Sequence, residues 1–380
     1  MRVLVFKSGD MCYGSLRFFT DLMCEAFKAA GIEVIECDFI PEPGMVKSRV
    51  NFVFGFNMML DKKDENGENI YDKMDVPIVD FIVDHPMMHK KSMEADVKQL
   101  YVVVLDRLHI DYIRTYFPSV KGATIGYLMG RTTEKGIKPI NERSIDILFS
   151  GTFDDERGLI KDLNSDKNDM DKLVLDCIEY MYNNSHVSTE KAIKDRIERR
   201  LGCDPGKEYL YELFSDIWLF IDVYMRKYNR RIVLEKIADA GLPLTLCGNG
   251  WENFRYVDNP NVSIRPSVDF DETFDLMADA RICVNVMPMF KAGIHDRILS
   301  ALQNGAVIAT DESEVICERF EDGKDSLIFS LDSIDSFVER IRELLEDQEK
   351  LQSIADGGIA KIREFTMVEN VGSILEMLYN

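Results

Sequence analysis

The chain has a shortage of positive charge and lacks any long apolar run. It carries 46 lysines and arginines against 67 aspartates and glutamates, a formal net charge of −21. A nucleic-acid partner needs a basic face to neutralise its phosphates, and anionic lipid attracts basic segments, so this charge argues against both. No apolar run approaches the roughly 20 residues that span a bilayer. We therefore expect no nucleic-acid partner and no integral membrane segment.

The sequence also lacks the cysteine spacings that are typical of secreted proteins, and we expect no signal peptide at its start. Its eight cysteines are scattered, and no two of them form a Cys-x-x-Cys pair. The first ten residues, MRVLVFKSGD, become polar too early for a signal peptide and are better interpreted as a first strand. These features indicate a reduced, cytoplasmic protein.

What the sequence does contain is enough apolar material for two ordinary domains, at 380 residues and 46% hydrophobic residues. Strand-length apolar runs alternate with helical segments in both halves, which predicts an α/β fold with parallel sheets. We expect an N-terminal Rossmann-like domain at 1–130, a linker at 130–143 and a second Rossmann-like domain at 144–365. The charged stretch at about 154–239 predicts a helical insertion in the second domain, and 366–380 predicts a final helix.

The most informative stretch is Arg281–Asp311, RICVNVMPMFKAGIHDRILSALQNGAVIATD. It predicts a strand at 282–286, a loop, a helix from His295 to Gln303 and a second strand at 306–309, which together form one βαβ unit. Ligands of open α/β sheets bind beyond the carboxyl ends of the strands, where this loop lies.

The start of that helix is a candidate anion site. His295, Asp296 and Arg297 fall in its first turn, where backbone N–H groups have no helical partner and the helix dipole attracts negative charge. A cation in this position is better placed when it neutralises an anion, which favours a bound phosphate. The alternative is that Arg297 pairs with Asp296 or another carboxylate and that His295 is polar surface.

The order of these residues resembles a known family. Asn285, Pro288, the Gly-x-His-x-Arg motif at 293–297, Gly305-Ala306 and Thr310-Asp311 are similar to the nucleotide-sugar-binding region of GT-B glycosyltransferases of the group-1 type. The most similar branch contains the spore-maturation CgeB-like proteins, which also have the Asp-His-Pro and Asp-Arg-x-His features found near residues 84 and 106.

The resemblance implies two Rossmann-like domains that face a cleft, with a nucleotide-sugar donor on the second domain and the acceptor on the first. It implies no cofactor besides the donor substrate and no metal, because cationic side chains and a helix start stabilise the leaving diphosphate. It also implies that a C-terminal helix crosses back to the first domain, for which Met367–Tyr379 is the candidate.

One departure from the family leaves the donor open. Many group-1 enzymes carry a glutamate in a Leu-Glu-Ala-Met pattern of this helix, where the present chain has Leu299-Ser300-Ala301-Leu302, and Gly293 stands where an earlier acid is expected. The identity of the base and of the sugar, and a retaining mechanism, therefore do not follow from the resemblance.

Two small polar loops are further candidates for donor binding. Gly248-Asn249-Gly250-Trp251 follows a predicted strand, and its glycines would let a backbone approach a pyrophosphate or a sugar closely. Ser150-Gly151-Thr152 follows another strand in the same way. The alternative for both loops is an ordinary turn.

The first domain offers the acid/base candidates. Asp84 and His85 end a predicted strand and precede Pro86, and an imidazole titrates near neutral pH. The alternatives are that His85 caps the strand and that Asp84 pairs with a lysine. Asp106 and His109 are second candidates, for which an ion pair is an alternative, and Gly14 is expected at a tight turn near the cleft or in an ordinary loop.

These observations predict a glycosyltransferase that moves a sugar from a nucleotide-sugar to an acceptor hydroxyl, without a metal and with inversion. The acceptor, whether glycan, protein or small molecule, is not defined by the sequence. Two alternatives stay open: a nucleotide-sugar epimerase of the same fold, and a non-catalytic nucleotide- or sugar-binding module.

Overall fold

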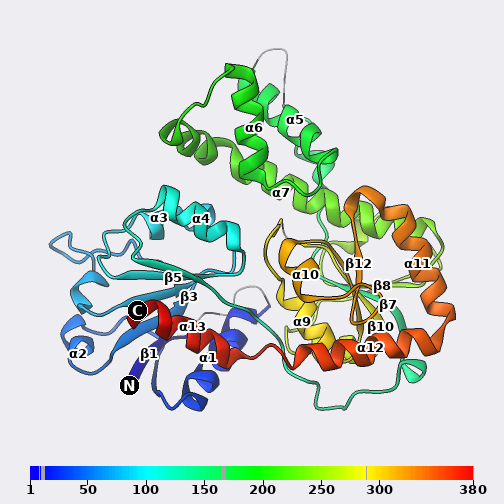
Figure 1. Cartoon of the computed structure of the whole chain (residues 1–380), viewed down its shortest axis with the longest axis horizontal. Helices are drawn as coiled ribbons and strands as arrows, with labels where there is room; N and C mark the ends of the chain where they lie inside the picture. Colours follow the sequence, from blue (N-terminus) through cyan, green and yellow to red (C-terminus); the bar gives the residue numbers. More distant parts are fainter. Residues whose placement is uncertain (8, 10–12, 164–167, 288, 380) are drawn as a thin grey trace. The chain divides into compact units, whose positions relative to one another are not determined.

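The computed structural model describes residues 1–7, 9, 13–163, 168–287 and 289–379 and divides into two compact units. Unit 1 consists of Met1–Met129 with Phe365–Asn380, and unit 2 of Gly130–Glu364. The last helix, α13 (Met367–Tyr379), packs against helix α1 (Ser15–Ala29) and strand β6 (Gly122–Ile125), so the end of the chain is part of unit 1 (Figure 1).

Unit 1 is built on a six-stranded sheet in which every neighbouring pair is parallel. Its strands follow the order β2-β1-β3-β4-β5-β6, so the chain changes direction across the sheet between β1 and β3. The remaining strands are β1 (Arg2–Phe6), β2 (Glu33–Cys37), β3 (Phe52–Phe56), β4 (Ile78–Phe81) and β5 (Leu100–Val104). β3 and β4 are buried along their whole length, which explains their nearly continuous apolar sequences.

Helix α1 covers one face of this sheet because its apolar residues recur every three or four positions. Phe27 of α1 meets Phe52 and Phe54 of β3 edge-on, at centroid distances of 5.8 and 5.2 Å. The helix α13 is attached through Asn370, whose Oδ1 accepts from Tyr127 N at 2.9 Å and whose Nδ2 donates to Tyr127 O at 2.7 Å. The other helices of unit 1 are α2 (Pro43–Lys47), α3 (Lys90–Met93) and α4 (Arg107–Tyr116), with 3₁₀ turns η1 (Asp72–Met74) and η2 (Pro86–His89).

Unit 2 contains a second parallel six-stranded sheet, with the order β12-β11-β10-β7-β8-β9. Its strands are β7 (Ile145–Ser150), β8 (Leu244–Cys247), β9 (Val262–Arg265), β10 (Ala280–Asn285), β11 (Val307–Asp311) and β12 (Leu327–Phe329). Numbered by their appearance in unit 2 and read from β9, they follow the doubly wound order 3-2-1-4-5-6. The topological switch point therefore lies between β7 and β10, where such sheets bind ligands.

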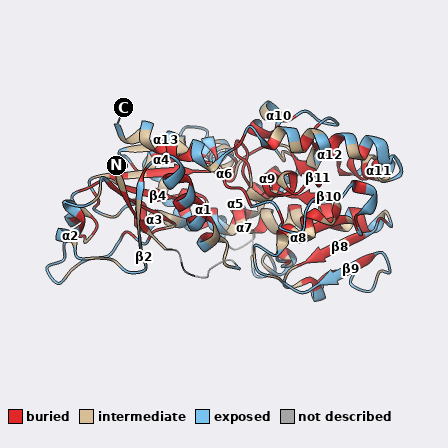
Figure 2. Cartoon of the chain, turned by 90° about the horizontal axis from the view of Figure 1, so that it is seen from below, coloured by how far each residue is buried: buried red, intermediate tan, exposed pale blue. Residues whose placement is uncertain are grey.

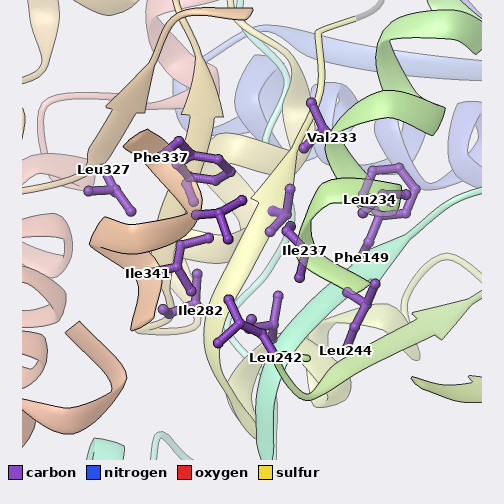
Figure 3. Close-up of a cluster of buried hydrophobic side chains, with 14 of the residues drawn as sticks. Phe149, Val233, Leu234, Ile237, Leu242, Leu244, Ile282, Leu327, Phe337 and Ile341 are labelled. Atoms are coloured by element: carbon purple, nitrogen blue, oxygen red, sulfur yellow. The ribbon is translucent and has the colours of Figure 1, made fainter. Parts of the chain in front are cut away.

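The core of unit 2 lies between this sheet and the helices α7 (Lys207–Asp239), α11 (Ile334–Glu346) and α12 (Gln348–Ile362). Figure 3 shows side chains of α7 and α11 directed towards strand residues of the sheet, among them Phe149, Leu244 and Ile282. The strands β8, β10 and β11 are largely buried, whereas the outer faces of the helices are exposed (Figure 2). The remaining helices are α5 (Asp169–Tyr182), α6 (Thr189–Leu201), α8 (Thr273–Ala278), α9 (Asp296–Gln303) and α10 (Glu314–Arg319).

The charged stretch after β7 forms a helical group of α5, α6 and the first half of α7, which pack on one another. In Figure 1 this group stands away from the sheet, and α7 continues from it to the sheet as one uninterrupted helix of 33 residues. Residues at the sheet end of α7, such as Val233 and Ile237, join the core of unit 2. A single helix thus links the insertion to the carboxyl edge of the sheet.

The segment 130–143, which we expected to be a linker, is instead held along unit 2. Gly130 N donates to Ser300 Oγ and Thr133 N to Asn304 Oδ1, each at 2.8 Å. Both acceptors belong to α9 or its C-terminal cap and are fully buried. Its polar composition suggested a solvent-exposed connection, but buried side chains satisfy its backbone, so the crossing between the units is short.

Candidate functional site

The site lies at the carboxyl edge of the sheet of unit 2, around its topological switch point. The loop 150–152 follows β7, the loop 248–251 follows β8, and Asn285 is the last residue of β10. The structure brings these predicted residues together with the start of α9. A Cβ atom at Gly151, for example, would lie only 3.4 Å from Nη2 of Arg297.

His295 forms the N-cap of α9. Its Nδ1 accepts from Arg297 N at 3.1 Å, so the neutral ring carries its proton on Nε2 and presents a donor there. Burial holds the pKa of His295 well below its usual value, and the positive charges of Arg297, Arg230 and Arg226 lower it further. The ring is therefore a neutral hydrogen-bond donor at physiological pH.

Arg297 is fixed from two sides. Its Nη1 donates to Asn285 Oδ1 at 2.7 Å, and its guanidinium lies over the ring of Phe149 at 5.1 Å. Asn285 is completely buried and also donates from Nδ2 to Thr310 Oγ1 at 2.9 Å. Asn285 thus holds the arginine in place, instead of reaching a ligand itself as we had expected.

Two arginines of α7, which were not predicted from the sequence, complete the site. The guanidinium of Arg230 lies over the same Phe149 ring at 5.3 Å and donates to the carbonyl of Thr152. Arg226, one turn earlier, is paired with the buried carboxylate of Asp222. The signal in the sequence was the run RKYNRR at 226–231, a basic cluster in a strongly acidic chain.

The electrostatics of this arginine cluster, which consists of Arg226, Arg230 and Arg297, favour an anionic ligand. Burial lowers the pKa of Arg230 to about 9, with Arg297 and Arg226 acting in the same direction. Burial also lowers the pKa of Arg297. Desolvated like charges are unfavourable alone, and an anion held between them relieves both the repulsion and the loss of hydration.

Burial raises the pKa of two carboxyl groups of unit 2, Asp296 and Asp311. Burial raises the pKa of Asp296 to about 6, against the opposing effect of Arg297, and Asp296 Oδ1 lies 3.1 Å from His295 Nδ1. Burial also raises the pKa of Asp311 to about 6, although its Oδ1 accepts from Met287 N at 2.7 Å. With a pKa of about 6, Asp296 is mostly ionised at neutral pH, and its charge raises the pKa of Arg297 against the effect of burial.

The glycines of the loop 248–251 allow two loops to pack tightly. A Cβ atom at Gly248 would lie 2.4 Å from Gly151 O, and one at Gly250 would lie 2.1 Å from Phe153 O. Trp251 is fully buried, stacks on Phe153 and donates from Nε1 to Gly151 O at 2.9 Å. The close approach that we expected between this loop and a ligand is made to the neighbouring loop, and within 248–251 it is Asn249 that is exposed.

The position that carries a glutamate in many group-1 enzymes lies inside unit 2 in this chain. Ser300 is fully buried, donates from Oγ to Asp296 O at 2.7 Å and accepts from Gly130 N. It holds the segment after Met129 against α9 and cannot contact a ribose. Of the other motif residues, Gly293 accepts through its carbonyl from Ser313 Oγ, and Pro288 lies outside the described residues.

Unit 1 places its candidates at the carboxyl ends of β4 and β5. His85 caps η2, with Nδ1 accepting from Met87 N at 3.0 Å, and Asp106 caps α4, with Oδ1 accepting from Leu108 N at 2.8 Å. The ring of His85 meets that of His109 at 4.6 Å, and both residues are buried. His85 therefore acts as a cap, and its neutral form presents an Nε2–H donor and not a basic nitrogen there.

Asp84 is the more accessible of the two leading acid/base candidates. Its side chain is 35% exposed, and its Oδ2 lies 3.4 Å from Asn57 Nδ2 and 3.9 Å from His89 Nε2. Gly14 has a φ of 78° and forms the N-cap of α1, and its expected place near the cleft stays a prediction. A carboxylate that is both accessible and held by a neighbouring amide is well suited to accept a proton.

Among the described residues, no group of three or more histidines, cysteines or acids is placed to hold a metal ion. Asp154 instead pairs with Lys227, and Asp155 with Arg157. Within the same described part of the chain, no helix combines the length and the apolar character needed to cross a membrane.

Two parallel six-stranded sheets, each covered by helices, define the class of the fold as GT-B, and solved structures of that class share it. An α-glucosyltransferase in complex with UDP and a 13-mer DNA containing a HMU base aligns over 100% of both chains, with 11% identity and a TM-score of 0.53. A sucrose-phosphate synthase from Thermosynechococcus elongatus aligns over 100% of this chain and 98% of its own, with 11% identity and a TM-score of 0.52. Alr3699/HepE from Anabaena, in complex with UDP and glucose, aligns over 99% and 98%, with 10% identity and a TM-score of 0.52.

The comparison of the sequence with models of protein families gives a more specific result than the comparison of structures. Residues 226–376 match a family model described as glycosyl transferase-like, and this stretch contains the arginine cluster and the start of α9. The C-terminal part of the chain is thus similar to glycosyl transferase-like proteins. No curated protein matches the chain.

Proposed function

We propose that this protein transfers a sugar from a nucleotide-sugar donor to an acceptor hydroxyl. The observation that carries the proposal is the convergence of Arg230 and Arg297 on the Phe149 ring, beside the neutral donor His295 and at the switch point of a parallel sheet, with Arg226 one turn from Arg230 on α7. The diphosphate of a nucleotide sugar supplies the anion that this cluster needs. The glycosyl transferase-like match over 226–376 and the GT-B fold support the same function.

In this proposal the arginine cluster stabilises the charge that develops on the diphosphate as the bond to the sugar breaks. Nε2 of His295 adds a hydrogen bond to the same oxygens, and the positive end of the α9 dipole adds to the favourable field. These groups offset the negative charge without a divalent cation, so we propose a metal-independent reaction. The absence of an acid on α9 at Ser300 means that the ribose must be held by other residues, which leaves the base and the sugar of the donor undefined.

The acceptor belongs to unit 1 in this proposal. Asp84 accepts the proton of the acceptor hydroxyl as its oxygen attacks the anomeric carbon, and the nucleoside diphosphate leaves from the opposite face, which inverts the configuration. The hydrogen bond to Nδ1 of His85 makes this ring a donor that orients the acceptor, so Asp84 is the better base of the two predicted residues. The proposed setting is cytoplasmic, and the relation to the CgeB-like branch stays a prediction that rests on the motif at 293–297.

One experiment separates this function from its two rivals. The intact protein is incubated with UDP-, GDP- and other nucleotide sugars, with and without a panel of hydroxyl acceptors, and release of nucleoside diphosphate is measured. Release that depends on an acceptor supports the transferase. Interconversion of the sugar without an acceptor supports an epimerase, and binding without turnover supports a binding module.

A further inference from the structure

Asn57 has an unusual backbone conformation at the end of β3. Its φ is 46°, in the left-handed region that residues other than glycine seldom adopt. β3 lies between β1 and β4, beside the switch point of the sheet of unit 1, so this residue stands at the edge where parallel sheets bind ligands. Strained residues of this kind are retained where the surrounding structure or the function requires them.

The left-handed conformation turns the backbone and the side chain of Asn57 towards the segment that follows β4. Asn57 N donates to Phe81 O at 3.1 Å, and Asn57 Oδ1 accepts from Val83 N at 3.1 Å. Asn57 Nδ2 donates to Asp84 Oδ2 at 3.4 Å. One residue therefore contacts three positions of the four-residue segment that carries the proposed base.

We propose that Asn57 is the positioning residue of Asp84 in the transfer reaction. Its amide holds the Asp84 carboxylate in one orientation, while its contacts with Phe81 and Val83 fix the backbone beneath that carboxylate. The inference rests on the proposed function of Asp84 as the base. It assigns a role in the reaction to a residue that itself has no acid/base chemistry.

One titratable group beside Asp84 belongs to η2. His89 of η2 lies 3.9 Å from Asp84 Oδ2, and it also lowers the pKa of Asp80, a fully buried carboxyl of β4. Asp80 is held by a different contact, because its Oδ1 accepts from Met58 N at 2.9 Å. Asn57 Nδ2 and His89 Nε2 thus approach the same carboxylate oxygen, Oδ2 of Asp84, at 3.4 and 3.9 Å.

Two substitutions test the proposal without a large change in backbone strain. Asn57→Gly keeps the left-handed conformation and removes the amide, and Asn57→Asp keeps an acceptor for Val83 N but places a second carboxylate beside Asp84. Asp75→Gly is the matched control, because Asp75 has a φ of 52° in the same unit but pairs with Lys47. Turnover, its pH profile, donor affinity and melting temperature are measured for all three.

We expect Asn57→Gly to lower kcat by roughly fivefold to tenfold, the loss of about one hydrogen bond, with donor affinity unchanged. Asn57→Asp should move the acid limb of the kcat/KM profile upward by about one pH unit, because a neighbouring carboxylate disfavours ionisation. Asp75→Gly should leave kcat and the pH profile of kcat/KM unchanged. Normal kcat and an unshifted profile in both Asn57 variants would overturn the inference, as would equal losses in the Asp75 control.

A second readout keeps this inference separate from the proposed function. The carboxyl of Asp84 is titrated by ¹³C NMR in the intact protein and in Asn57→Asp, with Asp84→Asn used to assign its signal. An upward shift in Asn57→Asp is expected whether or not the protein turns over a nucleotide sugar, and an unchanged titration contradicts the contact. A shifted titration in a protein without acceptor-dependent release would refute the proposed function and retain the Asn57–Asp84 relationship alone.

Discussion

The guanidinium of Arg297 donates from Nη1 to Oδ1 of Asn285 over 2.7 Å, which joins the first turn of α9 to the last residue of β10. The same amide donates from Nδ2 to Thr310 Oγ1 on β11. The arginine is therefore oriented by two neighbouring strands before any ligand is present. Such preorganisation avoids the free-energy cost of fixing a long side chain at the moment of reaction.

Replacement of Arg297 should reduce turnover more than it reduces stability. A charge-assisted hydrogen bond contributes roughly 1.5–3 kcal/mol, so we expect Arg297→Ala to lower turnover by at least about tenfold to a hundredfold. Arg297→Lys should restore only part of this, because an ammonium cannot make the forked contact. Steady-state kinetics and a melting curve check the prediction, and a lower melting temperature with normal turnover would make Arg297 a structural residue.

Arg230 and Arg231 are neighbours with opposite expected roles. Arg230→Ala should weaken nucleoside diphosphate binding by roughly tenfold or more with little change in melting temperature. Arg231 is bound at 2.7 Å by the fully buried Glu156, so Arg231→Ala should lower the free energy of unfolding by about 3–5 kcal/mol. Calorimetric titration with UDP and GDP, beside thermal unfolding, separates the two. If Arg230→Ala binds both nucleotides normally, the arginine cluster is not the anion site.

The contact between the two glycine-containing loops should tolerate no side chain. Gly250 has a φ of 85°, and a Cβ there would lie 2.1 Å from Phe153 O, so we expect Gly250→Ala to destabilise unit 2 by well over the roughly 1–2 kcal/mol of a left-handed alanine. Gly241→Ala, with a φ of 70° and no atom nearer than 3.7 Å, should show the backbone effect alone. Both tryptophans, Trp218 and Trp251, lie in unit 2, so their fluorescence reports its unfolding. Equal effects of the two substitutions would argue against the close packing.

The buried carboxyl of Asp80 should make the stability of unit 1 depend on pH. Burial raises its pKa from 3.8 to about 7, so the folded state retains a proton that the unfolded state releases. This contribution to stability is complete below pH 3.8, decreases as the pH rises and is lost above pH 7, a total of about 4 kcal/mol. Asp80→Asn keeps the acceptor for Met58 N and should be more stable than the unmodified chain at pH 8. Hydrogen exchange of the β4 amides at pH 5 and pH 8 measures the stability of unit 1. Equal protection of the variant and the unmodified chain at pH 8 would refute the prediction.

Turnover should survive removal of divalent cations. The arginine cluster and the start of α9 supply the positive charge for the leaving diphosphate. EDTA should therefore change the turnover rate by less than about twofold, because divalent cations take no part in the proposed reaction. The same assay with added Mg²⁺ or Mn²⁺ is the control. Complete loss in EDTA that either ion restores would show that a metal carries this role.

The alternation of apolar runs predicted the parallel strands well, because buried parallel strands have continuous apolar sequences. Strands β1 and β8 lie where strands were expected, at the start of the chain and before Gly248, and α9 begins one residue after the expected His295. The short helix α2 was missed, since Pro43–Lys47 is too brief to show a helical period. The segment 130–143 was misinterpreted because its hydrogen-bond partners, Ser300 and Asn304, are distant in the sequence.

The candidate site was predictable where its residues adjoin a strand end. Arg297 and His295 could be named from one βαβ unit, but Arg230 lies more than 60 residues earlier on a helix whose face towards the sheet no local pattern reveals. The roles of Asn285 and Trp251 could not be read from the sequence either. The same motif position can hold a buried residue that supports the site or an exposed residue that contacts a ligand. Only the packing of the folded chain shows which of the two roles a residue has.

The return of α13 to unit 1 has a consequence for the order in which the chain is completed during synthesis. Residues of α1 and β6 are made first, but the helix that packs on them, and the amide of Asn370 that satisfies the backbone of Tyr127, appear only after the whole of unit 2 has been made. Unit 1 is thus the first unit to begin and the last to be complete. Until the ribosome reaches the final residues, its apolar surface beneath α13 has no cover, and a chain that ends early at residue 364 would leave unit 2 whole and unit 1 open.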